Sequence, residues 1–287
     1  MFVNKWVRKM YGIFDLSLKI TNWCNLHCAH CRANSGRNTG IQLMPLEKIE
    51  NYIAQFQELP LNLSNRITID GGEPMLPYVM GDENYIPTAL CLISKAGAIP
   101  VIKTNGTWGQ TYNNRSLILK SLAKNACFIG RPLTINMPVD EFHDNISGVS
   151  NIVADVVFSD YLRGTLNIDI SGFNTIGSVV ANARWRSDLK SKEIDTLDLI
   201  TGDLVAYNNE GEGMHICMDY ESGIKNCGRA LKNHVYTNDN FTTYVNKIQV
   251  DNEDNVMLNY VVGDRLDNRS LSSVLDILIN KINASSK

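Results

Sequence analysis

Three closely spaced cysteines are the first feature of this sequence that could do chemistry. Cys24, Cys28 and Cys31 lie within eight residues, directly after the strand-like run at residues 14–20. A loop with this spacing can fold its thiolates around one compact centre, and soft thiolates select zinc, copper(I) or an iron–sulfur cluster. A [4Fe-4S] cluster normally takes four thiolates, so three would leave one iron open to another ligand. An open metal site is typical of catalysis, whereas a closed site is typical of structure.

Two other assignments for this loop stay open at this point. His27 or His30 could complete a tetrahedral zinc site, because zinc binds imidazole as well as thiolate. The cysteines could also be reduced thiols with a structural role. A short cysteine motif alone does not separate these alternatives, but the next segments of the chain favour a cluster.

A second motif, Gly71-Gly72-Glu73-Pro74, follows a predicted strand at residues 66–70. In parallel α/β folds, ligands bind at the C-terminal ends of the strands, and a glycine pair there permits close approach of the backbone to a ligand. A carboxylate and carbonyl groups suit an ammonium group in charge and in hydrogen bonding. Alone, this tetrapeptide could be an ordinary turn. One strand–helix unit after the cysteine loop, it indicates a ligand site.

Together, the two motifs resemble those of the radical S-adenosylmethionine (SAM) enzymes. That family has a C-x3-C-x2-C cluster loop, usually with an aromatic residue before the last cysteine, where this chain has His30. The resemblance implies a cluster loop at residues 21–34 and one [4Fe-4S] cluster, whose open iron binds SAM. It assigns the metal to Cys24, Cys28 and Cys31. It assigns the SAM amino group to the motif Gly71, Gly72, Glu73 and Pro74.

Three weaker resemblances add candidate SAM contacts. Thr104 and Asn105 belong to a Thr-Asn-Gly turn, which in the family often closes the third strand and could equally be a simple strand-end turn. Asn136 ends the fourth predicted strand, where the family often places a polar residue near the SAM ribose or carboxylate. Ile176, with Gly177 beside it, partly matches the family's adenine motif.

An acidic, histidine-containing loop follows Asn136. Asp140 and His143 within it resemble the corresponding loop of many family members. The resemblance leaves two alternatives open for them, contact with substrate or SAM and a solvated loop.

The fold is predicted as α/β, because strand and helix signals alternate and so favour βαβ units with a parallel sheet. The family resemblance implies a partial (β/α)6 TIM-like barrel with a side opening for substrate. The predicted strands lie at residues 14–20, 66–70, 100–103, 133–136, 166–170 and 197–200 or slightly beyond, and the predicted helices at 46–59, 86–95, 116–126, 152–161 and from 174 or 175 onward.

A polar, glycine-containing break at residues 208–213 predicts a domain boundary. We expect the barrel at residues 1–207 and a small α+β C-terminal extension at 208–287. Within the extension, the sequence predicts a strand pair at 244–250 and 256–260 and a helix at 271–282. This part is similar in shape to the SPASM or twitch extension of radical SAM enzymes, which frames an auxiliary iron–sulfur cluster.

The extension has few cysteines for a second cluster. Cys217 and Cys227 are only two thiolates, which cannot hold a [4Fe-4S] cube unaided. We therefore predict a degenerate extension without a second cluster; the alternatives are an auxiliary cluster or a thiol that donates hydrogen. Cys91 and Cys127 are predicted to be core residues, since free cysteine is often buried.

The composition excludes several classes of protein. Hydrophobic residues make up 44% of the chain, which excludes a disordered protein, and a net charge of −3 gives no field for nucleic acid or anionic lipid. No signal peptide or membrane-spanning apolar run is visible. Seven cysteines, an odd number, fit a reducing compartment, so we expect a soluble, cytoplasmic protein. The sequence does not indicate an oligomeric state.

The family resemblance implies reductive cleavage of SAM to a 5′-deoxyadenosyl radical that abstracts hydrogen from a substrate. It also implies an electron donor such as flavodoxin or ferredoxin. The extension favours modification of a ribosomally made peptide, with a small molecule such as a sugar, nucleoside or amino acid as the alternative. A non-catalytic metal-binding regulator is a further alternative, but a structural site would not need Gly71 to Glu73.

Overall fold

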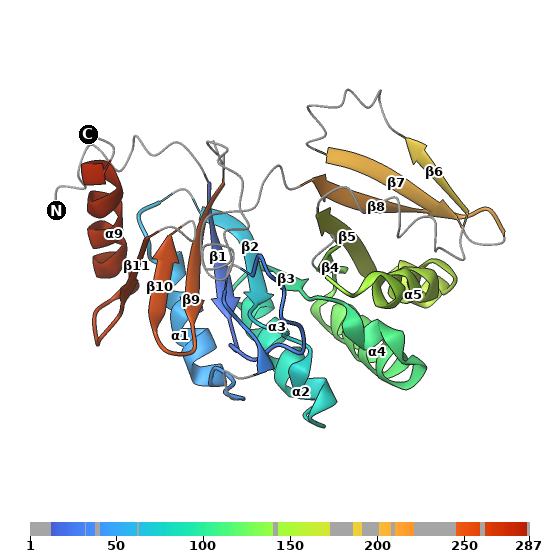
Figure 1. Cartoon of the computed structure of the whole chain (residues 1–287), viewed down its shortest axis with the longest axis horizontal. Coiled ribbons are helices and arrows are strands. Elements are labelled where there is room, and N and C mark those ends of the chain that lie inside the picture. Colours follow the sequence, from blue (N-terminus) through green and yellow to red (C-terminus); the bar gives the residue numbers. More distant parts are fainter. Residues whose placement is uncertain are drawn as a thin grey trace.

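The described strands belong to one sheet that runs through the whole molecule (Figure 1). The computed structural model describes residues 13–31, 33–37, 41–61, 63–139, 143–172, 186–190, 201–207, 210–220, 245–258 and 262–285. The strands are β1 (Ile13–Lys19), β2 (Leu63–Asp70), β3 (Ile99–Lys103), β4 (Leu133–Pro138), β5 (Leu166–Gly172), β6 (Arg186–Lys190), β7 (Thr201–Tyr207), β8 (Gly213–Tyr220), β9 (Val245–Asp251), β10 (Asn255–Leu258) and β11 (Val262–Arg265).

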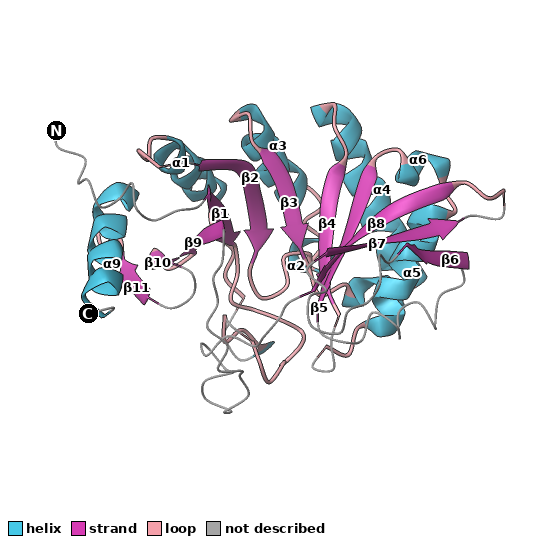
Figure 2. Cartoon of the chain, turned by 90° about the horizontal axis from the view of Figure 1, so that it is seen from above, coloured by secondary structure: helices cyan, strands magenta, loops and turns pink. Residues whose placement is uncertain are grey.

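Helices follow most of the parallel strands, and α1, α3 and α4 lie along one side of β1 to β4 (Figure 2). The predicted α/β class is therefore confirmed. The helices are α1 (Leu46–Gln57), α2 (Leu76–Val79), α3 (Tyr85–Lys95), the 3-10 helix η3 (Thr107–Gln110), α4 (Tyr112–Ile129), α5 (Ile146–Val157), α6 (Asp160–Arg163) and α9 (Leu271–Ser285).

The sheet is open, as a partial barrel requires. Its strand order is β11-β10-β9-β1-β2-β3-β4-β5-β8-β7-β6, and the run from β9 to β8 is parallel throughout. Arg66 on β2 and Asp169 on β5 form an ion pair at 3.8 Å, although β3 and β4 lie between their strands. Three strand spacings would separate them by about 14 Å in a flat sheet. This contact across two intervening strands agrees with a sheet that curves, with the face that carries these two residues on the inside.

The inner face of this curved sheet is polar. On β1, Phe14, Leu16 and Leu18 are buried in the apolar core, whereas Ser17 and Lys19 take the alternate positions on the other face. Strands β5 and β9 repeat this alternation. Parallel strands covered by helices on both faces are usually apolar at every position. Polar residues on one face therefore indicate that this face lines a cavity.

The sixth parallel strand differs from the sequence prediction. Residues 191–200 lie outside the described residues, and the strand that begins at Thr201 is β7, which runs antiparallel to β8. The strand parallel to β5 is β8, at residues 213–220. The break at 208–213 contains Gly211, whose φ of +83° suits the reversal between β7 and β8. The domain boundary predicted there stays a prediction.

The predicted C-terminal strand pair is confirmed as the antiparallel strands β9 and β10. Strand β9 also pairs in parallel with β1, so this hairpin extends the barrel sheet at its first strand. The predicted C-terminal helix is confirmed as α9, which contacts α1, β10 and β11 (Figure 1).

One predicted helix was wrong in extent. The helix expected at residues 152–161 is two helices, α5 and α6. The chain between them reaches an extended conformation at Ser159, whose hydroxyl accepts a hydrogen bond from the Leu162 N–H. A serine that caps the next helix ends the first one early.

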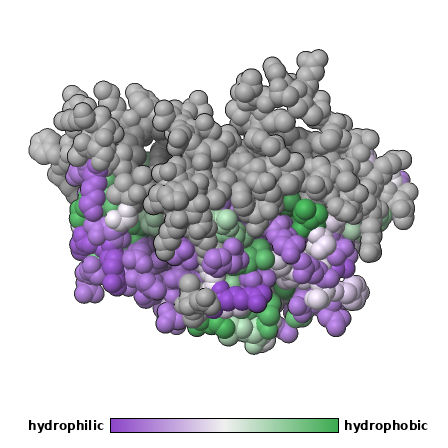
Figure 3. Space-filling view, in the orientation of Figure 1, coloured by the Kyte–Doolittle hydropathy of each residue, from purple (hydrophilic) through white to green (hydrophobic). Residues whose placement is uncertain are grey.

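The described surface visible in Figure 3 is mostly hydrophilic, with apolar side chains gathered at its lower edge. Two apolar residues at the end of α2, Val79 and Met80, are among the exposed ones. No helix in the described part of the chain is long and apolar enough to cross a membrane.

Candidate functional site

The loops after β1, β2 and β3 meet at one pocket. It has an empty volume of about 850 Å³, which includes open solvent. The sequence-predicted residues that line it are Cys24, Cys28, Cys31, Gly71, Gly72, Thr104, Asn105 and His143. Parallel strands bring their C-terminal ends to the same edge of the sheet, and this geometry explains why motifs 80 residues apart converge.

Two sulfur atoms of the cysteine loop accept hydrogen bonds. The Ser35 N–H donates to Cys31 Sγ at 3.3 Å, and the Asn105 side-chain amide donates to Cys24 Sγ at 3.6 Å. The Cys31 N–H donates to the Cys28 carbonyl at 3.2 Å, which forms the turn between these two residues. Hydrogen bonds to cluster sulfurs are one of the factors that set a cluster's reduction potential. The loop is therefore suited to thiolates that carry a metal.

Cys24 is the buried member of the three, with 8% of its surface exposed. Burial, together with the nearby Glu73 carboxylate, raises the pKa of the Cys24 thiol to about 12. A thiolate at this position therefore needs a positive partner, and a metal centre supplies one.

The donor set, three thiolates on one loop, has the chemistry that an iron–sulfur cluster takes. Among the described residues, no three His, Cys, Asp or Glu side chains gather closely enough to bind one metal ion. A cube makes a different demand, because each thiolate binds its own iron. Cys24, Cys28 and Cys31 are on one loop and line one pocket, which satisfies that demand.

The glycine pair is needed for a reason that the sequence did not predict. A Cβ at Gly72 would lie 1.8 Å from the Trp23 carbonyl oxygen, and a Cβ at Gly71 would lie 2.7 Å from that of Thr21. The Gly72 N–H donates to the Thr21 carbonyl at 2.8 Å, and the Glu73 N–H donates to the Trp23 carbonyl at 2.9 Å. The two glycines therefore let the β2 loop pack directly on the backbone of the cysteine loop.

Glu73 connects the loops after β2 and β3. Its carboxylate accepts hydrogen bonds from the Thr104 hydroxyl at 2.6 Å, from the Asn105 N–H at 2.9 Å and from the Met75 N–H at 2.8 Å. It is 4% exposed, and burial raises its pKa to about 7 despite these three donors. The carboxylate thus holds the frame of the site together. Its predicted contact with the SAM amino group stays a prediction.

Asn105 connects the β3 loop with the cysteine loop. Its side-chain amide donates to Asn25 Oδ1 at 2.9 Å as well as to Cys24 Sγ, and its own Oδ1 accepts from the Thr107 N–H at 3.0 Å. Its carbonyl accepts from the Asn145 side chain at 2.6 Å. Asn105 therefore fixes the position of the buried cysteine, a role that a turn signal in the sequence could not reveal.

His30 and His143 meet at the rim of the pocket. Their rings lie edge to face, with centroids 5.0 Å apart and planes at 77°. His30 occupies the position where the family that the two motifs resemble usually has an aromatic residue. Here the ring packs against the loop that follows β4, so an aromatic group at this position has a packing role.

The remaining residues predicted from the sequence lie away from the pocket or outside the described residues. Asn136 is at the end of β4, where its Oδ1 accepts from the Ser171 hydroxyl at 3.2 Å, and Pro74 is buried behind the glycine pair. Neither lines the pocket. Asp140, Ile176, Gly177 and Cys227 lie outside the described residues. Cys217 is described as backbone in β8, where it pairs in register with Asp169.

Two cysteines outside the site do not behave alike. Cys91 is half-buried in α3, and its sulfur accepts from the Asn125 side chain at 3.6 Å. Cys127 is exposed on α4, with its sulfur 3.8 Å from the Tyr161 hydroxyl. The prediction of a core position is therefore wrong for Cys127, because this face of α4 is turned to solvent.

Sequence reasoning missed several residues that line the pocket. They are Asp70 at the end of β2, Lys103 at the end of β3, and Gln249 on β9. Gln249 is 4% exposed and comes from β9, which the sequence placed in a separate extension. The signal for it was the alternation along residues 247–250, where Ile248 and Val250 are the apolar members.

Comparisons with known proteins give the following matches. No family model matches the chain. A curated relative, described as the uncharacterized protein MJ0907 of Methanocaldococcus jannaschii, is 38% identical over 69 residues, which are 23% of this chain. The matched part spans 22% of that relative, about a fifth of its length.

Three solved structures are similar at low identity. Streptococcus suis SuiB bound to S-adenosylmethionine is 13% identical with a TM-score of 0.46, covering 95% of this chain and 68% of SuiB. Native anSMEcpe with bound AdoMet is 19% identical with a TM-score of 0.37, covering 55% of this chain and 43% of that chain. BtrN in complex with AdoMet and 2-DOIA is 16% identical with a TM-score of 0.34, covering 56% and 58%. All three TM-scores are below 0.5, so the proposed function depends on the site itself.

Proposed function

We propose that this protein is a radical SAM enzyme with one [4Fe-4S] cluster on Cys24, Cys28 and Cys31. The observation that supports this proposal is the pocket lined by all three cysteines and by the Gly71–Gly72 backbone. Gly71 and Gly72 thus line the same pocket as the cysteines, in addition to packing on the backbone of the cysteine loop. The bound cluster and SAM would supply one-electron chemistry, with methionine and a 5′-deoxyadenosyl radical as the products of SAM cleavage.

The chain's own residues hold this site in place. Thiolates of the three cysteines bind metal, while donors from Ser35 and Asn105 favour their negative charge. The Gly71 and Gly72 carbonyls are the proposed acceptors for the SAM ammonium, as an ammonium needs acceptors and offers only donors. Thr104 and Asn105 line the same pocket, and their proposed contacts with SAM are additional to the bonds that fix the loops.

We propose a ribosomally made peptide as the substrate. Support comes from the hairpin β9–β10 and helix α9, the elements from which the sequence predicts an extension similar in shape to SPASM or twitch. A small molecule is the second candidate, because polar side chains line the pocket and could hold one by hydrogen bonds; they are Asp70, Lys103 and Gln249. A flavodoxin or ferredoxin is the proposed electron donor, and nucleic acid is not a proposed partner.

The test of the chemistry is anaerobic reconstitution with iron and sulfide, followed by SAM, dithionite and a chromatographic assay for 5′-deoxyadenosine. We expect product from the wild type, none from Cys28→Ala, and undiminished product from Cys91→Ala, which removes a cysteine outside the pocket. About four irons per chain with neither SAM binding nor product would favour the metal-binding regulator instead.

The number of clusters has its own test. We expect the double variant Cys217→Ala, Cys227→Ala to keep the iron content of the wild type, because two thiolates cannot hold a second cube unaided. Loss of about half of the iron would contradict a single cluster. Mass spectrometry of reactions with peptides and with small molecules would then separate the two substrate classes.

A further inference from the structure

A buried lysine at the end of β1 contacts the cysteine loop. Lys19 is the last residue of β1 and is on the polar inner face, yet only 7% of it is exposed. Its Nζ donates to the Ala33 carbonyl at 3.1 Å, two residues after the last cysteine. A buried ammonium is rare because leaving water is costly, so its position calls for a partner.

Negative groups face Lys19 from each neighbouring element. Asp70 is its register partner on β2, and Asp251 is its register partner on β9. The Glu253 carboxylate and the Cys31 sulfur also interact electrostatically with the Lys19 ammonium. Burial lowers the pKa of Lys19, while Asp251, Cys31, Asp70 and Glu253 oppose that shift. The ammonium is thus the positive centre of a group that includes one of the proposed cluster ligands.

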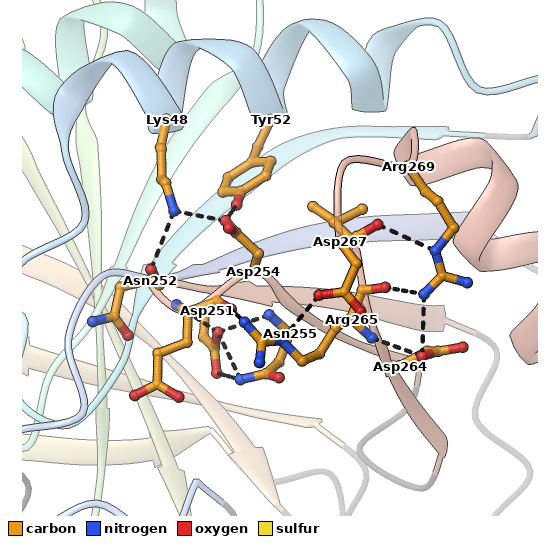
Figure 4. Close-up of polar contacts among 12 residues, drawn as sticks. Lys48, Tyr52, Asp251, Asn252, Asp254, Asn255, Asp264, Arg265, Asp267 and Arg269 are labelled. Atoms are coloured by element: carbon orange, nitrogen blue, oxygen red, sulfur yellow. Dashed lines mark hydrogen bonds and ion pairs between the residues drawn. The ribbon is translucent and has the colours of Figure 1, made fainter.

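The acidic turn between β9 and β10, which follows Asp251, is linked to neighbouring elements. Its Asp254 accepts hydrogen bonds from Lys48 at 2.7 Å and from the Tyr52 hydroxyl, both on α1 (Figure 4). In the same turn, Asn252 Oδ1 accepts from the Asn22 side chain at 3.5 Å, which links the turn to the cysteine loop. The acidic turn is therefore linked both to α1 and to the cysteine loop, on the β9 side of Lys19.

We propose that Lys19 is a positioning residue for the iron–sulfur cluster, which ties the end of the cysteine loop to β1 and raises the cluster's reduction potential. This inference rests on the proposed cluster at Cys24, Cys28 and Cys31. Reduction adds negative charge to a cluster, and a cation in a desolvated site stabilises that charge more strongly than one in water. Without the Lys19 charge, the nearby carboxylates would oppose reduction of the cluster more strongly.

The test is a redox titration of reconstituted protein, followed by electron paramagnetic resonance of the reduced cluster. Lys19→Met keeps an unbranched side chain of similar volume but removes the charge and the donor, whereas Lys19→Gln removes the charge and keeps a donor. We expect both to lower the ratio of reduced to oxidised cluster at a fixed potential about tenfold, which is about 59 mV for one electron. Lys19→Arg should stay within about twofold of the wild type.

A matched control is Lys247→Met on β9. Lys247 is on the same inner face but pairs in register with Asp15, further from the cysteine loop, so the potential should not change. The proposal would be overturned if Lys19→Met and Lys19→Gln had full iron content and the same cluster reduction potential as the control. If these two variants take up no iron, the outcome depends on Lys19→Arg. Iron uptake by Lys19→Arg would support the proposal, and its failure to take up iron would overturn the proposal. A wild type that forms no cluster would instead refute the proposed function.

Discussion

The cysteine loop and the β9–β10 turn lie next to each other, but they are held in different ways. The cysteine loop is fixed by backbone hydrogen bonds to the β2 loop and, through Asn105, to the β3 loop. The turn is linked to α1 by side chains, through the Tyr52 hydroxyl and the ion pair between Lys48 and Asp254, each with 37% of its side chain exposed. Backbone contacts leave no room for a substitution, whereas an exposed ion pair contributes little and depends on salt. The site therefore has a rigid side, the cysteine loop, and an adjustable side, the β9–β10 turn.

Replacing Gly72 should break the rigid side and have the largest effect. In Gly72→Ala the new Cβ meets the Trp23 carbonyl at 1.8 Å, so the two loops must separate. We expect loss of cluster uptake and a fall of several kcal/mol in the free energy of unfolding, the size typical of severe backbone disruption. Iron analysis and chemical denaturation measure the two effects.

Gly97→Ala is the control for this prediction. Gly97 has a φ of +78°, and no atom lies within 4 Å of the position that a Cβ would take, so only left-handed strain of about 1–2 kcal/mol is expected. Iron uptake should be unchanged. Equal effects of the two variants would show that the loop contact at Gly72 has no special role.

Glu73, on the rigid side, should make the stability of the folded protein depend on pH. Its pKa in the folded protein is raised to about 7, above its unfolded value, so the folded state binds more protons between the two pKa values. The stability that this group contributes is complete below the unfolded pKa and is lost as the pH rises through the folded pKa. We expect the melting temperature of cluster-free protein to fall between about pH 5 and pH 8, and to fall less in Glu73→Gln.

Glu253→Gln is a suitable control for the pH prediction, because it removes an exposed carboxylate near the same site. It should keep the pH slope of the wild type. A wild-type profile that is flat, or that rises over the same pH range, would contradict a raised pKa of Glu73.

Asp254→Asn should affect the adjustable side and have the smallest effect. Asp254 has a φ of +64°, which asparagine tolerates, so the substitution removes the charge without backbone strain. We expect a loss of about 1 kcal/mol or less, because the ion pair is partly exposed. The difference from the wild type, measured by chemical denaturation, should shrink in about 1 M salt. A loss as large as that of Gly72→Ala would mean that both sides are equally rigid.

Local patterns in the sequence were enough to predict most elements of the barrel. Strands β1 to β5 carry apolar runs that end in turn signals, and the C-terminal strand pair has its own turn at residues 251–255. The sixth parallel strand was not predictable in this way. Periodicity identifies a strand but not its direction, and the pairing of β8 with β5 depends on contacts between distant segments.

The sequence by itself determined the chemistry that the site offers: three thiolates at fixed spacing, and a Gly-Gly-Glu-Pro motif at the end of the next strand. It could do so because ligand type and spacing are local properties of a loop. Only the tertiary structure decided what holds them. The contact of Gly72 with Trp23, the bonds from Thr104 and Asn105 to Glu73, and the burial of Lys19 all join segments far apart in the chain. Packing between such segments leaves no local pattern in the sequence, because each partner alone is an ordinary glycine, carboxylate or lysine.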